Sequence, residues 1–261
     1  MSDTVTRSRP RTVARPIIRE HRIPTEGSKP YISVEGADGC LWFCESGTSK
    51  IGRLNPKDYS FQEFALPTPN ATPIGIVPGA NDDCWFAEKS GNKIGRITLK
   101  GEITEFPVPT PNAGPDAMML GPDGNIWFSE TEVSQIGRLT PGGKFTEFKD
   151  GITPGSKPLS IVVRDGALWF SEAAGNHVGR ITVDGKVTEF PIPTKGSQPR
   201  AMCPHPDGSI WFVQTSANGL CRVDRDGGMI EYKVTTPDAS LRSVCEMYGP
   251  APHPRSADSR T

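Results

Sequence analysis

The chain has 261 residues, of which 23% are charged and 35% are hydrophobic, and its formal net charge is −1. This composition suits a globular protein with a sizeable core. The near-neutral charge argues against a basic nucleic-acid or membrane-surface protein, and the absence of any run of about 18 apolar residues argues against a transmembrane helix. We therefore expect neither a nucleic acid nor a membrane among its partners.

The N-terminal residues 1–16 contain four arginines, without the apolar stretch that follows them in a secretory signal. Pro10 and Pro16 interrupt any amphipathic helix, so the segment is predicted to be a disordered tail. The six cysteines form no Cys-x-x-Cys pair, which indicates free, mostly buried thiols in a reducing compartment. We expect a cytoplasmic protein.

From residue 42 onward the sequence repeats itself every 42 or 43 residues. Three features keep this spacing: a Trp, an Arg that follows Gly in four of five cases, and a Glu followed by an aromatic residue. The tryptophans are Trp42, Trp85, Trp127, Trp169 and Trp211, and the arginines are Arg53, Arg96, Arg138, Arg180 and Arg222. A fixed period of this length indicates an array of structural repeats.

Each repeat holds four short runs rich in β-branched and aromatic residues, separated by Gly, Asn, Asp and Pro. In the second repeat these runs are 73–77, 84–88, 93–99 and 103–108. No segment has a sustained apolar period of 3.6 residues, which argues against helices. Four strands per repeat are typical of a β-propeller blade, whose faces are covered by neighbouring blades. The Gly before Arg predicts a close backbone approach.

The two ends of the chain carry parts of a further repeat. Residues 17–25 align with residues 102–110, and Thr25 matches Thr110, so we expect an outermost strand that closes the ring. After the fifth repeat, only 242–247 reads as an innermost strand. The sequence thus predicts an all-β propeller over 17–248, with five full four-stranded blades plus a partial sixth closed by the N-terminal strand. Residues 249–261 are predicted to be a second disordered tail.

The repeat resembles a known family. WFAEKSGNKIGRITLKGEITEFPVPTPNA, residues 85–113, is similar to the blade signature of streptogramin B lyases, also called virginiamycin B lyases. The resemblance runs from about residue 17 to 244. It implies a seven-bladed propeller that linearises cyclic depsipeptide antibiotics by elimination, with Mg²⁺ as Lewis acid. Against seven blades, this chain looks as if it lacks the C-terminal ones.

The family's catalytic pattern does not map onto this sequence. Its reactive His follows a blade-opening Pro, and here that slot holds Tyr31, Ile74, Asp116, Leu159, Arg200 and Arg242. The family's Glu-Pro-His reads Gln198-Pro199-Arg200 at its nearest approach, and its second Glu falls on Thr215. Catalytic residues and Mg²⁺ ligands are therefore not identified, and the magnesium ion comes from the resemblance alone.

The same slot is the best candidate for a binding site, because it varies where the rest of the repeat does not. We predict that Tyr31, Asp116, Arg200 and Arg242 bind substrate at one mouth of the axis. Arginine forks suit a carboxylate or a carbonyl-rich ligand, and Tyr offers a stacking face. The alternative interpretation is a solvated funnel rim.

Other polar residues receive a structural interpretation. Glu45, Glu88, Glu130 and Glu172 recur three residues after a Trp, where the fifth repeat has Gln214. We expect them to bond backbone groups of neighbouring blades; a metal held at the axis is the alternative. His21, His177, His205 and His253 have no partner at triad spacing, and we expect structural or surface roles for them.

Two functional hypotheses follow. The first is a virginiamycin B lyase-like protein that linearises type B streptogramins, although the family's catalytic His and Glu residues are missing. The second is a non-catalytic propeller that binds a small ligand or a peptide at the axial mouth. A lactone-hydrolase-like propeller ranks third, because it needs an acidic metal cluster at the axis. The expected partner is a small molecule or cyclic peptide, and the expected state is a monomer, with self-association through the open blade edge as the alternative.

Overall fold

The computed structural model describes residues 18–244 of the chain. Within this range there are twenty strands in five antiparallel sheets, and no helix. The strands of blades 1 and 2 are β1 Pro30–Glu35, β2 Leu41–Glu45, β3 Lys50–Leu54 and β4 Phe61–Ala65, then β5 Pro73–Pro78, β6 Cys84–Glu88, β7 Lys93–Ile97 and β8 Ile103–Pro107. Those of blades 3 and 4 are β9 Pro115–Leu120, β10 Ile126–Glu130, β11 Gln135–Leu139 and β12 Phe145–Phe148, then β13 Pro158–Arg164, β14 Ala167–Glu172, β15 His177–Thr182 and β16 Val187–Pro191. Blade 5 consists of β17 Pro199–Pro204, β18 Ile210–Gln214, β19 Gly219–Val223 and β20 Met229–Lys233.

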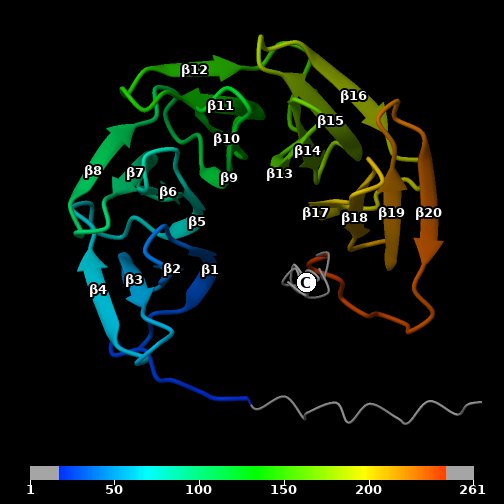
Figure 1. Cartoon of the computed structure of the whole chain (residues 1–261). Coiled ribbons are helices and arrows are strands. Elements are labelled where there is room, and N and C mark those ends of the chain that lie inside the picture. The colour runs from blue at the N-terminus through cyan, green and yellow to red at the C-terminus, as the bar shows by residue number, and fades with distance from the viewer. Residues whose placement is uncertain (1–17, 245–261) are drawn as a thin grey trace, which may run out of the picture.

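The five sheets are arranged around a central axis as propeller blades (Figure 1). Each blade pairs its strands in chain order, with the first strand nearest the axis and the fourth at the rim (Figure 1). The predicted all-β propeller with five full blades is thereby confirmed. The arc is open between blade 1 and blade 5 (Figure 1).

The described residues form no partial sixth blade: the predicted N-terminal closing strand is wrong, and the predicted innermost strand, 242–247, lies partly outside the described residues. Residues 18–29 and 234–244 contain no strand. A strand needs a hydrogen-bonded neighbour, and the described chain offers none on that side of the arc. The N-terminal segment follows blade 1 instead, where Thr25 bonds to Glu63 and His21 stacks on Tyr59. The predicted tails, 1–16 and 249–261, lie outside the described residues.

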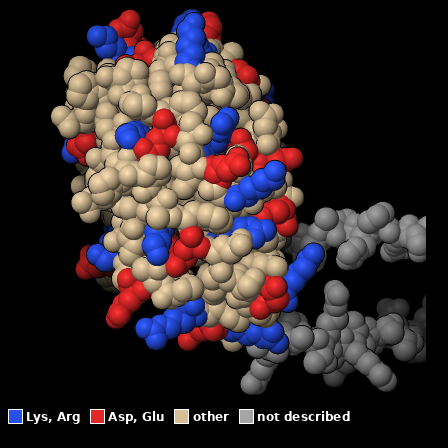
Figure 2. Space-filling view, turned by 90° about the vertical axis from the view of Figure 1, so that its left-hand side faces the viewer, with Lys and Arg blue, Asp and Glu red and all other residues tan. Residues whose placement is uncertain are grey.

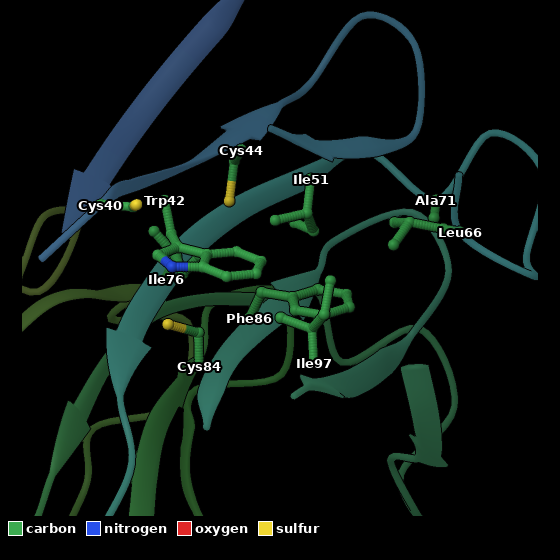
Figure 3. Close-up of a cluster of buried hydrophobic side chains, with 10 residues drawn as sticks. All are labelled: Cys40, Trp42, Cys44, Ile51, Leu66, Ala71, Ile76, Cys84, Phe86 and Ile97. Atoms are coloured by element: carbon green, nitrogen blue, oxygen red, sulfur yellow. The ribbon is translucent and has the colours of Figure 1, made fainter. Parts of the chain in front are cut away.

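The core lies between the blades. Trp42 and Cys44 of blade 1 pack with Phe86 and Ile97 of blade 2 in one buried cluster (Figure 3). Alternation along the second strand explains this arrangement: the Trp faces the following blade and the next residue, Phe, faces the preceding one. The same contact recurs at the next three interfaces. Trp211 of blade 5 has no following blade in the described part of the chain and is the one Trp that is not fully covered.

The glycine before each arginine makes room for that Phe. A Cβ added to Gly52, Gly95, Gly137 or Gly179 would lie 2.1–2.2 Å from the Cζ atom of the Phe opposite it. The predicted close approach is therefore confirmed, and it is the aromatic ring that lies against the glycine. Blade 5 has Cys221 at this place, opposite Phe212.

Lys, Arg, Asp and Glu side chains are interspersed on the outer face of the propeller that Figure 2 shows. This face therefore has no large area of a single charge sign. In residues 18–244 no helix is long and apolar enough to cross a bilayer. Cys40, Cys44, Cys84 and Cys221 are buried free thiols, as expected.

Candidate functional site

Four of the five blades that contribute to the predicted slot, together with the segment after β20, meet at one cavity. Its volume is about 330 Å³, and its lining includes Tyr31 of β1, Asp116 of β9, Arg200 of β17, and Arg242. Leu159 of β13 also lines it. The structure thus brings all four predicted binding residues together around the axis.

A backbone irregularity directs these side chains toward the cavity. In every blade the pairing of the first and second strands shifts register close to the blade-opening proline. A bulge of this kind re-aims the residues within it. Tyr31 and Arg200 both lie inside such a shift and are exposed.

Arg242 reaches the cavity without belonging to a strand. Thr215 donates its hydroxyl to the Leu241 carbonyl at 2.9 Å. Asn218 donates its amide to the Thr236 carbonyl at 2.8 Å and accepts from the Ala239 N–H at 3.0 Å. The same asparagine contacts hold the corresponding segment in blade 2, so the repeat's own connection fixes Arg242.

The structure differs from the predicted slot at two residues. Ile74 is buried and does not line the cavity. Lys89, which follows Glu88 at the end of β6, does line it, and its ammonium lies 2.6 Å from the Asp116 carboxylate. The sequence signal was present, because the position after the repeated Glu holds Ser46, Thr131, Ala173 and Thr215 in the other blades.

The cavity is cationic. Lys89, Arg200 and Arg242 contribute three positive charges and Asp116 one negative charge. Within the described residues neither guanidinium has an ion-pair partner. Mg²⁺ prefers several oxygen ligands, with carboxylates among them. Here the one carboxylate is ion-paired with Lys89 and stands among cations, so the cavity does not fit the magnesium ion that the family resemblance implies.

The repeated glutamates lie away from the cavity, in the body of the blades. Glu45, Glu88, Glu130 and Glu172 are fully buried, and seven of their eight side-chain oxygens have no hydrogen-bond partner in the described chain. The expected bonds to backbone groups of neighbouring blades are therefore wrong. Each of these residues faces a second glutamate on the fourth strand of its own blade: Glu63, Glu105, Glu147 or Glu189.

It is the fourth-strand glutamate that joins neighbouring segments. Glu105 accepts the backbone N–H and the hydroxyl of Thr68 at 2.9 and 2.7 Å. Thr25, Thr110, Thr153 and Thr194 make the same pair of contacts to the fourth-strand glutamates of the other blades. Thr25, which aligns with Thr110 in the sequence, thus makes the same contact as Thr110.

Protonation of the buried second-strand glutamate removes the charge repulsion between the two facing carboxyl groups. Burial, reinforced by the facing glutamate, raises the pKa of Glu88 and of Glu130 to about 8. Blade 5 replaces this residue with Gln214, whose amide donates to Glu231 at 2.5 Å. Because an amide has the shape of a protonated carboxyl and donates at the same place, the substitution indicates that the position requires a donor.

Blade 4 alone adds a metal-ligating side chain to this arrangement. Ligand atoms of Glu172, His177 and Glu189 lie within 4.8 Å of one another, which in the described residues is the one such His/Cys/Asp/Glu group. His177 Nδ1 lies 3.2 Å from Glu172 Oε2. Burial first, and then the facing Glu189, raise the pKa of Glu172 to about 9.

The model of the virginiamycin B lyase family matches residues 5–245. None of the curated proteins matches.

Many solved structures are similar, among them the following three lyases. Selenomethionine-substituted virginiamycin B lyase from Staphylococcus aureus is 38% identical, with a TM-score of 0.83 over 87% of this chain and 78% of that one. A streptogramin B lyase is 36% identical, with a TM-score of 0.83 over 87% and 76%. A catalytically inactive histidine-to-alanine variant of the S. aureus lyase with quinupristin is 38% identical, with a TM-score of 0.83 over 87% and 77%. This chain belongs to the virginiamycin B lyase family.

Proposed function

We propose that the axial cavity binds a streptogramin-type cyclic depsipeptide or a similar carbonyl-rich ligand. The observation that carries the proposal is the pair of guanidinium groups, Arg200 and Arg242, which share one cavity with Tyr31 and lack ion-pair partners in the described residues. The inactive S. aureus lyase solved with quinupristin supports the ligand class.

The chemistry of the lining suits such a ligand. Guanidinium groups donate paired hydrogen bonds to carbonyl or carboxylate oxygens, and the Tyr31 ring, 67% exposed, offers a flat apolar surface. The ion pair between Lys89 and Asp116 holds both side chains in place, and Asp116 retains acceptor capacity for ligand N–H groups. The ligand can therefore bind without breaking the ion pair between Lys89 and Asp116.

A titration with quinupristin tests the proposal. Arg200→Ala and Arg242→Ala should each weaken binding by about 10- to 100-fold, because a hydrogen bond to a charged group contributes roughly 1.5–3 kcal/mol. Arg225→Ala is the matched control, since Arg225 lies in a turn of the same blade and pairs with Asp165 outside the cavity. Equal affinity of all four proteins would refute binding at this site.

Linearisation of the depsipeptide is the second candidate function, and family membership favours it. Elimination requires a base that removes the proton alpha to the ester carbonyl. Among the described residues that line the cavity there is no His, and the one carboxylate is paired with Lys89. We therefore propose binding as the main function and turnover as the point to be tested.

Chromatography with mass detection separates the outcomes. Elimination opens the ring without changing the mass, hydrolysis adds one water, and pure binding leaves the cyclic compound intact. The reaction is run with Mg²⁺ and with a chelator. A chelator-sensitive isomer of unchanged mass would establish the lyase; unchanged quinupristin would leave binding as the function.

We further propose that the chain acts as a cytoplasmic monomer. Its buried free thiols support a reducing compartment. The alternative is self-association through the face of blade 1 that is turned toward the opening of the arc. Leu41 is 37% exposed on this face, whereas the corresponding Ile126 of blade 3 is 1% exposed. Light scattering after size-exclusion chromatography checks the oligomeric state.

A further inference from the structure

Blade 4 carries an arrangement of side chains that the binding function does not use. Glu172, His177 and Glu189 come from β14, β15 and β16, and their ligand atoms lie within 4.8 Å of one another. Glu172 has a fully buried side chain, and neither of its oxygens has a hydrogen-bond partner in the described chain. His177 Nδ1 is likewise buried without such a partner. Both side chains point into the same space, since Nδ1 and Glu172 Oε2 are 3.2 Å apart.

In blades 1 and 2 the corresponding space holds the ammonium group of a lysine. In blade 2 the Lys93 ammonium contacts Glu105 Oε2 and Thr68 Oγ1. In blade 1 the Lys50 ammonium lies 3.3 Å from Glu63 Oε2 and 2.6 Å from Thr25 Oγ1. The fold thus places a positive charge between the fourth-strand glutamate and the interblade threonine. Blade 4 keeps Glu189 and Thr153 but replaces the lysine with His177.

We propose that blade 4 binds a divalent transition-metal ion, Zn²⁺ in the first place, through Glu172, His177 and Glu189. The ion takes the position that the lysine ammonium occupies in blades 1 and 2. A nitrogen ligand with two carboxylates suits Zn²⁺ better than Mg²⁺ or Ca²⁺, which prefer oxygen alone. Zinc with bonds of about 2.0–2.1 Å holds tetrahedral ligands about 3.3 Å apart, close to the distance between His177 Nδ1 and Glu172 Oε2.

The site is structural. It lies within the blade, and none of its three residues lines the axial cavity. Because Glu189 also bonds to Thr153 of the connection between blades 3 and 4, the ion joins the three outer strands of blade 4 to that connection. The ion binds the folded chain and not the unfolded chain, and it therefore raises the melting temperature.

Calorimetric titration of the tag-free protein with ZnCl₂ tests the proposal. The wild type should bind one Zn²⁺ with an increase in melting temperature. His177→Lys reproduces blades 1 and 2 at this position, and Glu172→Gln reproduces blade 5. Each should therefore fold normally and bind Zn²⁺ at least about 100-fold more weakly, because a direct ligand is lost. His205→Ala, which removes the imidazole beside Asp207, should bind like the wild type.

A gain of binding gives an independent check. Lys93→His in blade 2, between Glu88 and Glu105, should raise the stoichiometry from one Zn²⁺ to two. Absence of Zn²⁺ binding by the wild type would overturn the proposal. So would a Zn²⁺ affinity that survives His177→Lys but is lost in His205→Ala, because the ion would then bind at the exposed turn.

Discussion

Glu130→Gln should remove a pH-dependent loss in the propeller's free energy of unfolding. Glu130 is fully buried, neither of its oxygens has a hydrogen-bond partner in the described chain, and the charged group that acts on it is Glu147. Blade 5 already carries a glutamine at this position, Gln214, which donates to the facing Glu231. The substitution therefore keeps the shape and the donor while abolishing the titration.

The magnitude follows from the pKa of Glu130, which burial, aided by Glu147, raises from 4.5 to about 8. Across this window the folded protein keeps the proton and the unfolded chain releases it. The unfolded state thus binds fewer protons, and the free energy of unfolding falls as the pH rises. The stabilising contribution of the protonated Glu130 carboxyl is fully present below about pH 4.5 and is lost as the pH rises through about 8. Each pH unit within the window costs about 1.4 kcal/mol, so the loss between pH 5 and pH 8 is on the order of 3–4 kcal/mol.

Urea unfolding followed by tryptophan fluorescence at pH 5, 6, 7 and 8 measures the effect. The advantage of Glu130→Gln over the wild type should grow by about 1 kcal/mol per pH unit. Glu132→Gln is the control, because Glu132 lies two residues away with a half-exposed side chain paired with Lys157. If Glu130→Gln and the wild type give parallel curves, Glu130 is ionised in the folded protein and the protonated carboxyl pair is refuted.

Three further changes test the packing and the positioning of the site, by urea unfolding or by quinupristin titration. Gly179→Ala places a Cβ 2.1 Å from a Phe ring and should destabilise the fold by about 1–3 kcal/mol, whereas Gly142→Ala, with no atom nearer than 3.9 Å, should not. Trp127→Ala should lower the free energy of unfolding by about 3–5 kcal/mol, and Trp211→Ala by clearly less, since no blade among residues 18–244 covers Trp211; equal losses would contradict the interblade core. Asn218→Ala should weaken quinupristin binding by freeing the segment before Arg242, and Arg242→Ala should then weaken it little further; additive effects of the two would show that Asn218 does not act through Arg242.

The blades were predictable because their pattern is set by contacts that every repeat must make. Trp42 and Gly52 recur at equivalent places since each blade needs one aromatic residue toward its neighbour and a gap for the Phe behind it. The cavity residues were predictable for the opposite reason. Tyr31, Asp116 and Arg200 occupy one slot at the axis, where no packing requirement fixes the residue type.

Three features required the structure. Lys89 departs from the small residues at its position in the other blades, but its contact with Asp116 was not predictable, because Lys89 lies in a turn and reaches the next blade through the length of its side chain. The pairing of Glu88 with Glu105 depends on the distance between the second and fourth strands, which sequence spacing does not give. Residues 17–25 resemble an outer strand, but a strand also depends on a neighbour, so the similarity led to the wrong prediction of a strand. The contact between Thr25 and Glu63 was found only in the structure.

A crystal structure of the chain with quinupristin tests the central claim most directly. Binding at the axial mouth predicts ligand carbonyl oxygens on the guanidinium groups of Arg200 and Arg242, with part of the ligand against the Tyr31 ring. Ligand found instead in the separate cavity of about 290 Å³ beside Phe43 and Phe61, on the open face of blade 1, would contradict it.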